Sequence, residues 1–367
     1  MNTNYYLIDY FNESPSIIQI VWSISAVFLL IIIPLILHLK FLRGHLRENE
    51  KRTAKYENQY ESFLIAYLYS GNEKEDISAE QHVIVDQLRN CITNPFRRKI
   101  FIGVLLKLKN EISGEIAESI HKLYSHLGLK DYALTRLRHK KWYVIAKGIR
   151  ELKQFHVKEA HDEIIVHINH PRREVRKEMQ LYMVNLFYFE GLDFLDILET
   201  SLSEWDQIQL LEVLQRMENQ NTTNIKFWLN SDNDSVVIFS LKLAKIYNQF
   251  EAKDELIHLL YHLNKKIRLE AIRVLNYLNA LEAKEILKNK IEYRSLEEQI
   301  AFFKMMENLY QPSDELFLLQ YIHYEIFEVK VSTLKILKVL NKEKFNSLQF
   351  QSSGPEFLKI VNYIDHH

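Results

Sequence analysis

The chain has 367 residues, only 8 glycines and 6 prolines, and a formal net charge of -1 at neutral pH. Such scarce turn residues, with abundant Leu, Ile, Lys and Glu, exclude an ordinary β-rich domain and indicate an all-helical protein. The single cysteine, Cys91, excludes an internal disulfide framework and a cysteine-based zinc site. The charge is uneven, with 19 basic and 9 acidic residues between Arg97 and Lys177, but 5 basic and 14 acidic residues between Glu178 and Glu255.

The first predicted element is a transmembrane helix. Ile17 to Leu37 are 21 consecutive positions without a charge, enough to cross a hydrocarbon core of about 30 Å. The segment lacks the positive n-region and the small-residue cleavage site of a signal peptide. Asp9 and Glu13 precede it without any Lys or Arg, whereas six basic residues follow it between Lys40 and Lys55. The positive-inside rule therefore predicts that the N-terminus is outside and the remainder is cytoplasmic.

After this segment, the pattern of charged and apolar residues changes several times along the chain. Mixed charges and a thin apolar stripe predict a basic, helical juxtamembrane stalk, and apolar runs without a common register then predict helical hairpins or a cap. A regular array follows and ends in a C-terminal tail or cap. The predicted organisation is an extracytoplasmic segment at 1–16, a membrane span at 17–37, a stalk at 38–60, hairpins or a cap at 61–139, repeats at 140–341 and a tail or cap at 342–367.

One helix recurs through the array with a period of 31 residues, shortened once to 30. Positions eight and eleven residues after the start of each copy are apolar and fall on the same helical face as the first. Shorter apolar runs lie between the copies, so each unit is predicted to be a helical hairpin that stacks on its neighbours. The first register positions are Val144, Val175, Asp206, Val236, Ile267, Glu298 and Val329.

Three of these helices carry a family resemblance. The segments Arg172 to Leu186, Lys265 to Leu278 and Glu328 to Leu340 resemble the second helices of HEAT-like repeats, and the short period is similar to that of phycobilisome-lyase-type HEAT repeats. The signatures of tetratricopeptide and ankyrin repeats are missing. The resemblance implies a right-handed α-solenoid of HEAT-like helical hairpins, here behind a single N-terminal transmembrane helix.

Motifs for catalysis and cofactor binding are missing from the sequence. His156, His161, His167 and His170 are close in sequence, but no HExxH motif or consistent ligand spacing accompanies them. Deoxyhypusine hydroxylases are HEAT-like enzymes that bind iron through His-Glu dipeptides, and this chain has none. It also lacks glycine-rich phosphate loops and the GxSxG motif. We therefore expect no enzymatic activity, no cofactor and no metal.

Basic residues cluster at the start of one helix and in two turns of the array. Turns of a solenoid lie along common edges, so the clusters are candidates for contact with anionic lipid or with an acidic partner; solvated faces with neighbouring ion pairs are the alternative. The near-neutral net charge and the membrane tether argue against nucleic acid. The candidate residues are Arg97, Arg98, Lys99, Arg136, Arg138, Lys140, Lys141, Arg172, Arg173, Arg176 and Lys177.

These features predict a single-pass protein of a bacterial inner membrane whose cytoplasmic solenoid is a non-catalytic scaffold or adaptor for a protein partner. Envelope enzymes such as glycosyltransferases, or signalling complexes, are candidate partners. The alternative is an enzyme or a lyase-like cofactor-transfer protein that uses the concave surface as a pocket. The acidic stretch from Glu178 to Glu255 is predicted to avoid an anionic membrane and to suit a basic partner.

Overall fold

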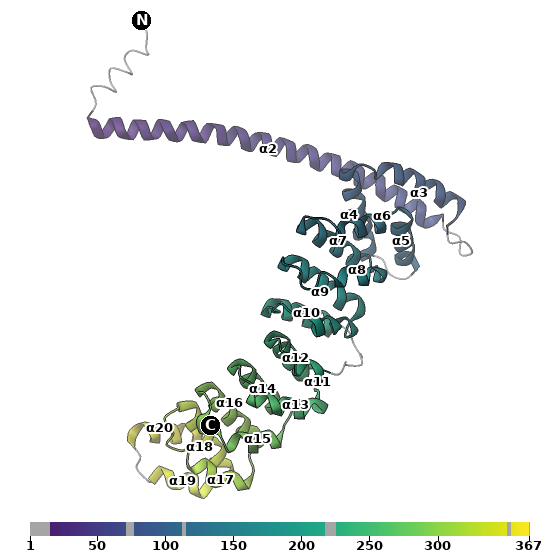
Figure 1. The fold of residues 1–367 in the computed structure, drawn as a ribbon. Helices are drawn as coiled ribbons and strands as arrows, with labels where there is room; N and C mark the ends of the chain where they lie inside the picture. Colours follow the sequence, from purple (N-terminus) through teal and green to yellow (C-terminus); the bar gives the residue numbers. More distant parts are fainter. Residues whose placement is uncertain (1–14, 71–76, 112–114, 217–224, 351–353, 367) are drawn as a thin grey trace. The chain divides into compact units, whose positions relative to one another are not determined.

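The computed structural model describes residues 15–70, 77–111, 115–216, 225–350 and 354–366, and every regular element in these ranges is helical (Figure 1). The chain forms two compact units, Met1–Asp131 and Tyr132–His367. We call them the N-terminal unit and the repeat unit. Residues 1–14 of the predicted extracytoplasmic segment lie outside the described ranges.

The N-terminal unit is built on one long helix, α2, which runs without a break from Ser16 to Tyr69 and contains Pro34. Its apolar first part has exposed side chains, and no other described segment covers it. Its last turns are amphipathic and bury Tyr60, Leu64 and Tyr67 against the following helices. Those helices are α3 (Ala79–Cys91) and α4 (Pro95–Glu111). The next helix, α5 (Glu115–His126), packs against α4, and α6 (Leu129–Leu137) crosses the boundary between the two units.

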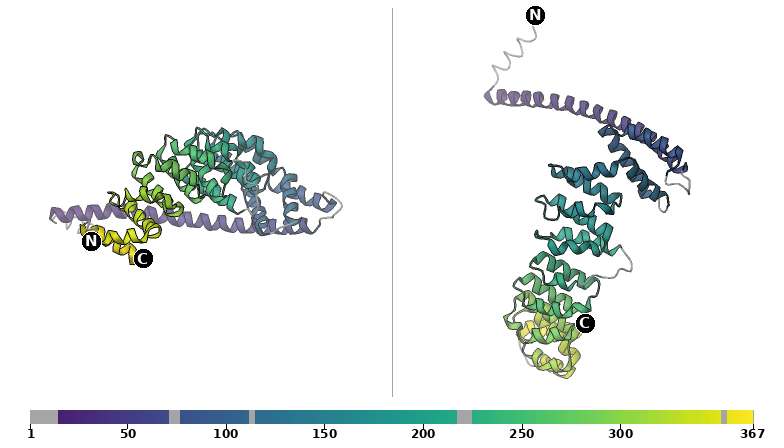
Figure 2. Two further views of the ribbon diagram at one scale, coloured as in Figure 1. Left: turned by 90° about the horizontal axis from the view of Figure 1, so that it is seen from below. Right: turned by 45° about the vertical axis from the view of Figure 1, so that its right-hand side comes forward.

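The repeat unit contains the predicted recurring helix seven times among the described residues, and the copies follow one another along the unit (Figures 1 and 2). Each predicted first register residue is the third residue of its helix, so the predicted register is confirmed in all seven copies. These second helices are α7 (Trp142–Gln154), α9 (Arg173–Phe187), α10 (Glu204–Gln215), α12 (Asp234–Ile246), α14 (Lys265–Tyr277), α16 (Leu296–Leu309) and α18 (Phe327–Leu340).

The first helices of the hairpins are shorter and partly 3-10 helical. A period of 31 residues leaves little room for them once a second helix and two turns are placed. They comprise η1 (Lys158–Ala160) with α8 (His161–Ile165), η2 (Glu190–Ile197), α11 (Lys226–Leu229), η3 (Phe250–Ala252) with α13 (Lys253–His258) and η4 (Leu259–Tyr261), α15 (Leu281–Lys288) with η5 (Ile291–Tyr293), and η6 (Pro312–Asp314) with α17 (Glu315–Leu319).

Several second helices end in the same local conformation. His156, Asn248 and Asn279 each lie twelve residues after a register residue and adopt positive φ angles of 54°, 50° and 55°. The next residue then donates its N–H to a carbonyl five residues back, as Ala280 does to Leu275 at 3.0 Å. This left-handed cap satisfies the free carbonyls at the helix end and turns the chain into the next hairpin.

The core of the repeat unit lies between the stacked hairpins. All seven residues eight positions after the register residues are buried. Consecutive second helices pack against each other from α7 to α10 and from α12 to α18. Between α10 and α12, Lys242 donates to Gln207 at 2.8 Å. Met217, one of the predicted apolar positions, lies outside the described residues. At the C-terminal end, α19 (Lys342–Phe350) and α20 (Gly354–His366) cover α18 through a cluster that includes Leu337, Phe345 and Val361. The predicted all-α array of stacked helical hairpins is confirmed.

Candidate interaction surfaces

Polar contacts link the second helices of consecutive repeats at equivalent positions. Near their starts, the Arg268 guanidinium donates to Glu298 at 2.7 Å, and Lys265 lies 2.6 Å from Glu297. Near their ends, Asn308 donates to Asn276 at 2.9 Å. Starts therefore meet starts and ends meet ends, so these helices run parallel. The loops that precede them lie on one edge of the array, which we call the loop edge.

Asp206 and Glu298 occupy register positions where the other repeats carry aliphatic side chains, yet both are buried. Each carboxylate accepts a hydrogen bond from the serine at its helix N-cap, Ser203 or Ser295, and another from an arginine of the preceding repeat. Burial raises the pKa of Glu298, but the hydrogen bonds from Arg268 and Ser295 outweigh it and lower that pKa to about 2. Both carboxylates can therefore occupy a buried register position, because hydrogen bonds satisfy them there.

Histidines recur on the loop edge for a local structural reason. His139, His170 and His262 each lie five residues before a register residue, and each accepts a hydrogen bond from the backbone N–H two residues later at 3.0 Å. His161 instead contacts Asp162 and the ring of Phe187. In the described part of the chain, no group of three or more His, Cys, Asp or Glu residues is placed to hold a metal ion.

Three of the predicted contact residues lie in the N-terminal unit, on α4. Arg97 lies over the ring of Tyr56, with 4.9 Å from its guanidinium carbon to the ring centroid. Arg98 donates to the carbonyls of Ile92 and Thr93, so it caps the end of α3. Lys99 is exposed. Two of the three are therefore engaged in local packing.

The other predicted contact residues lie in the repeat unit, and several are occupied by structural contacts. Arg136 pairs with the buried Glu151 at 2.6 Å, and Arg173 pairs with Asp206 at 3.0 Å. Arg176, in the first turn of α9, donates to the carbonyls of His170 and Pro171 in the preceding loop. These three cations therefore hold the loop edge and the repeats together.

The remaining cations of this set are more accessible. Arg138 pairs with Glu163 at 3.1 Å in an exposed contact, and Lys141 lies 5.8 Å from the centroid of the Tyr143 ring. The side chains of Lys140, Arg172 and Lys177 make no hydrogen bond or ion pair with any residue in the described ranges. These three residues are the free part of the predicted basic surface, and Lys140 and Arg172 lie on the loop edge in consecutive repeats.

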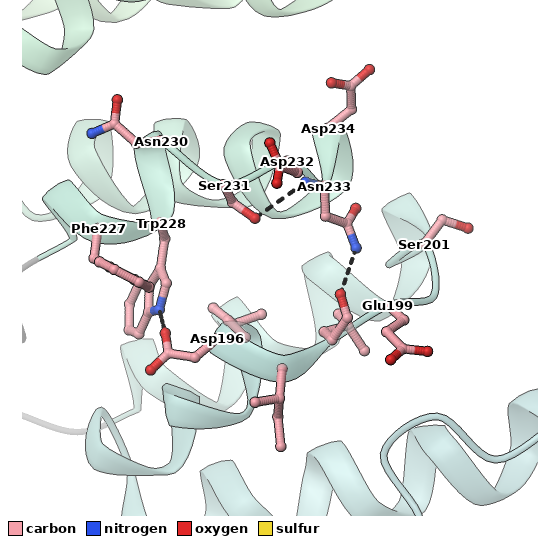
Figure 3. Close-up of a pocket in the computed structure, with 13 residues that line it drawn as sticks. Asp196, Glu199, Ser201, Phe227, Trp228, Asn230, Ser231, Asp232, Asn233 and Asp234 are labelled. Atoms are coloured by element: carbon pink, nitrogen blue, oxygen red, sulfur yellow. Dashed lines mark hydrogen bonds between the residues drawn. The ribbon is translucent and has the colours of Figure 1, made fainter.

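A groove with acidic walls lies between two neighbouring repeats and was not predicted as a site. It is formed by the end of η2 and its following loop on one side, and by α11 and its following loop on the other (Figure 3). Its cavity volume is about 920 Å³. Four carboxylates and no Lys or Arg line this acidic groove. The lining residues are Leu195, Asp196, Ile197, Leu198, Glu199, Ser201, Phe227, Trp228, Asn230, Ser231, Asp232, Asn233 and Asp234.

Hydrogen bonds connect the two walls of the acidic groove. The indole Nε1 of Trp228 donates to Asp196 at 2.6 Å, and the Asn233 amide donates to the Leu198 carbonyl at 3.0 Å (Figure 3). The same amide also donates to the Thr200 carbonyl at 3.1 Å. Glu199 and Asp232 are exposed, and their carboxylates have no partner among the residues that the structure describes. The hydrogen bonds of Trp228 and Asn233 therefore connect the walls without using the carboxylates of Glu199 and Asp232, which remain available to a ligand.

An exposed apolar row adjoins these carboxylates. Val166, Ile197 and Phe227 each lie nine residues before a register residue, in three consecutive repeats, and are 71%, 55% and 71% exposed. The equivalent residues of the other repeats are Thr135, His258, Asn289 and Gln320. Neighbouring loops of the row touch, since Asn169 donates to the Ile197 carbonyl at 3.1 Å. Alignment of the repeats by their register would have revealed this row in the sequence.

Comparisons with known proteins give matches to solved structures at low sequence identity and low TM-score. No model of a known protein family matches the sequence, and no curated protein matches it. An engineered protein of known crystal structure is 14% identical over 84% of this chain and 98% of its own, with a TM-score of 0.37. Human deoxyhypusine hydroxylase in complex with glycerol is 14% identical over 79% of this chain and 98% of its own, with a TM-score of 0.29.

Proposed function

We propose that this chain is a membrane-anchored, non-catalytic scaffold or adaptor whose repeat unit holds a protein partner at the cytoplasmic face of the membrane. The observation that carries the proposal is helix α2. Its first part is apolar enough to cross a bilayer and is not buried, while its last turns bury Tyr60, Leu64 and Tyr67 in the N-terminal unit. A removable signal peptide would not extend as one helix into a folded core.

The dimensions of α2 support an anchor followed by a rigid spacer. The uncharged segment spans about 32 Å as a helix, which matches a hydrocarbon core. From Leu37 to Tyr60, the first fully buried residue of α2, the helix advances roughly 35 Å more. This stretch contains Lys40, Arg43 and Arg47, which suit the headgroup region of a cytoplasmic leaflet. The folded helices would thus begin clear of the lipid.

The architecture of the repeat unit supports the scaffold role. Stacked hairpins offer long surfaces with side chains repeated at fixed register, which suit an extended protein partner. The free cations Lys140, Arg172 and Lys177 support contact with an acidic partner or with anionic headgroups. A bacterial inner membrane remains the proposed location, and envelope enzymes such as glycosyltransferases, or signalling complexes, remain the proposed partners.

The anchor is tested by fractionation of the full-length chain. We expect it to stay in the membrane pellet after alkaline carbonate extraction, with the intact mass of 43.9 kDa. Replacing Leu29 and Ile32 by Arg should release it, since a charge at the centre of a span costs about 3 kcal/mol. The matched control places Arg at Ser16 and Gln19, near the end of the apolar segment. A shorter product lacking the apolar segment would mean cleavage and overturn the anchor.

The scaffold role is tested by crosslinking the intact protein in its native membranes and identifying the products by mass spectrometry. A reproducible protein partner linked through residues 132–367 is the expected result. Links only to lipid and to other copies of the chain would contradict a scaffold and favour self-assembly or the lyase-like alternative.

A further inference from the structure

We propose that the acidic groove and the apolar row together form a docking site for a lysine- and arginine-rich amphipathic helix of a partner protein. This inference rests on the proposed scaffold function and names the chemistry of its partner. The site comprises the exposed side chains of Val166, Ile197 and Phe227 with the neighbouring carboxylates of Glu199 and Asp232.

Charge complementarity identifies the occupant. The groove lining contains Asp196, Glu199, Asp232 and Asp234 but no basic residue, and the stretch around it has 14 acidic residues against 5 basic ones. Lys226, next to Phe227 in the chain, is 3.6 Å from Glu255 and is therefore already paired. An approaching cation would gain favourable interactions with several carboxylates, whereas an acidic segment would be repelled.

The crowding of negative charge extends to Asp193, three residues before Asp196 in η2. Burial raises the pKa of Asp193, and the nearby carboxylates of Asp196 and Glu190 raise it further. Bound Lys or Arg side chains would relieve this like-charge repulsion. The same crowding makes a second acidic surface or an anionic membrane an unsuitable occupant.

The spacing of the apolar row indicates the form of the partner. Equivalent positions of stacked helical repeats lie roughly 10 Å apart, as packed helices do. Seven residues of an α-helix advance about 10.5 Å and return to nearly the same face. In an extended strand, residues three apart cover a similar length but point to opposite faces. A helix with an apolar residue at every seventh position therefore matches Val166, Ile197 and Phe227.

The direct test uses the full-length chain in nanodiscs of zwitterionic phosphatidylcholine and a synthetic helical peptide. The peptide carries Leu at every seventh position and Lys on the flanking positions, and its binding is measured by fluorescence anisotropy. We expect the pair Glu199→Lys and Asp232→Lys to weaken binding about tenfold or more. The matched pair Glu325→Lys and Glu343→Lys changes the net charge equally at exposed sites near the C-terminal end of the repeat unit and should change affinity less than about twofold.

The apolar row is tested separately with the same peptide. Ile197→Ser with Phe227→Ser should also weaken binding about tenfold, because two exposed apolar contacts are lost. Leu263→Ser with Leu316→Ser is the control, since these side chains are 97% and 76% exposed and lie outside the row. The site would be overturned if a peptide with Glu in place of Lys bound with the same affinity. It would also be overturned if the control variants lost as much affinity as the variants of the groove and the row.

Photo-crosslinking in native membranes separates this inference from the scaffold function. With a photo-reactive residue at Phe227, we expect links to a partner segment rich in Lys and Arg. A partner captured through other positions of the repeat unit, but not from position 227, would leave the scaffold function standing and overturn the groove. Self-association that the Glu199→Lys and Asp232→Lys pair abolishes would identify a second copy as the occupant and also overturn the assignment.

Discussion

At the scale of single residues, charged side chains inside the array act as connectors between repeats. Glu298 stands where most repeats carry an aliphatic residue, and it is 0% exposed. Its carboxylate accepts from Ser295 in its own helix and from Arg268 in the preceding one. The pair of Asp206 with Arg173 shows the same arrangement three hairpins earlier in the array. A sequence of the form Ser-x-x-Asp or Ser-x-x-Glu at the helix start is the local signal for it.

Replacing Glu298 by Gln should lower the free energy of unfolding by about 3 kcal/mol, because Arg268 loses a buried partner. The control Glu297→Gln removes the exposed pair with Lys265, whose side chains are 52% and 46% exposed, respectively. It should cost less than about 1 kcal/mol. Urea unfolding of the full-length chain, followed by circular dichroism, compares the two variants. Equal losses would contradict the connecting role of Glu298.

The same residue predicts a dependence on acid. The pKa of Glu298 is lowered from 4.5 to about 2 in the folded protein. Its stabilising contribution is therefore complete above pH 4.5 and is lost as the pH falls towards 2. We expect the Tm of the wild type to fall more steeply across this window than the Tm of Glu298→Gln. Parallel curves would mean that another group dominates the acid response.

At the scale of the helix, the starts of the first two second helices, α7 and α9, differ from those of the next four. The N-cap residues of α10, α12, α14 and α16 are Ser203, Asn233, Asn264 and Ser295. Those of α7 and α9 are Lys141 and Arg172, which make no capping hydrogen bond. A cation at the positive end of a helix dipole is unfavourable. The starts of α7 and α9 are therefore less stable than those of the capped helices, and both starts lie on the loop edge.

The variant Arg172→Asn should therefore stabilise the protein by about 1 kcal/mol, because it supplies the N-cap that α9 lacks and removes an unfavourable charge. Thermal unfolding of the full-length chain measures the change as a higher Tm. Arg172→Ala removes the charge without adding a cap, and its smaller gain separates the two causes. A lower Tm for Arg172→Asn would show that Arg172 makes a stabilising contact.

At the scale of the whole molecule, stability is distributed along the array because each hairpin packs on its neighbours. Ala271 is fully buried in α14, which packs against α12 and α16. The variant Ala271→Asp should destabilise these helices by on the order of 3 kcal/mol, since it buries an unpaired charge. Hydrogen exchange should accelerate in α12, α14 and α16 and stay unchanged in α3 and α4. Uniform acceleration in both units would contradict local cooperativity.

The sequence by itself determined the helical class, the register of the seven second helices and the apolar segment of α2. These features follow from local periodicity, because an apolar stripe repeated every turn forces one face of each helix inward. Even the exceptions at Asp206 and Glu298 had a local signal in the serine three residues earlier. The register could therefore be predicted even in the two repeats that carry a charged residue at this position.

Only the tertiary structure decided which charges are free and where a groove opens. Arg136, Lys140, Arg172 and Arg173 are all basic residues in the same two clusters of the sequence. In the structure, Arg136 pairs with Glu151 and Arg173 pairs with Asp206. The side chains of Lys140 and Arg172 have no partner among the described residues. The acidic groove likewise joins loops of adjacent hairpins that are about thirty residues apart in the chain. Such contacts depend on how hairpins stack, and stacking brings together residues whose proximity no local pattern records.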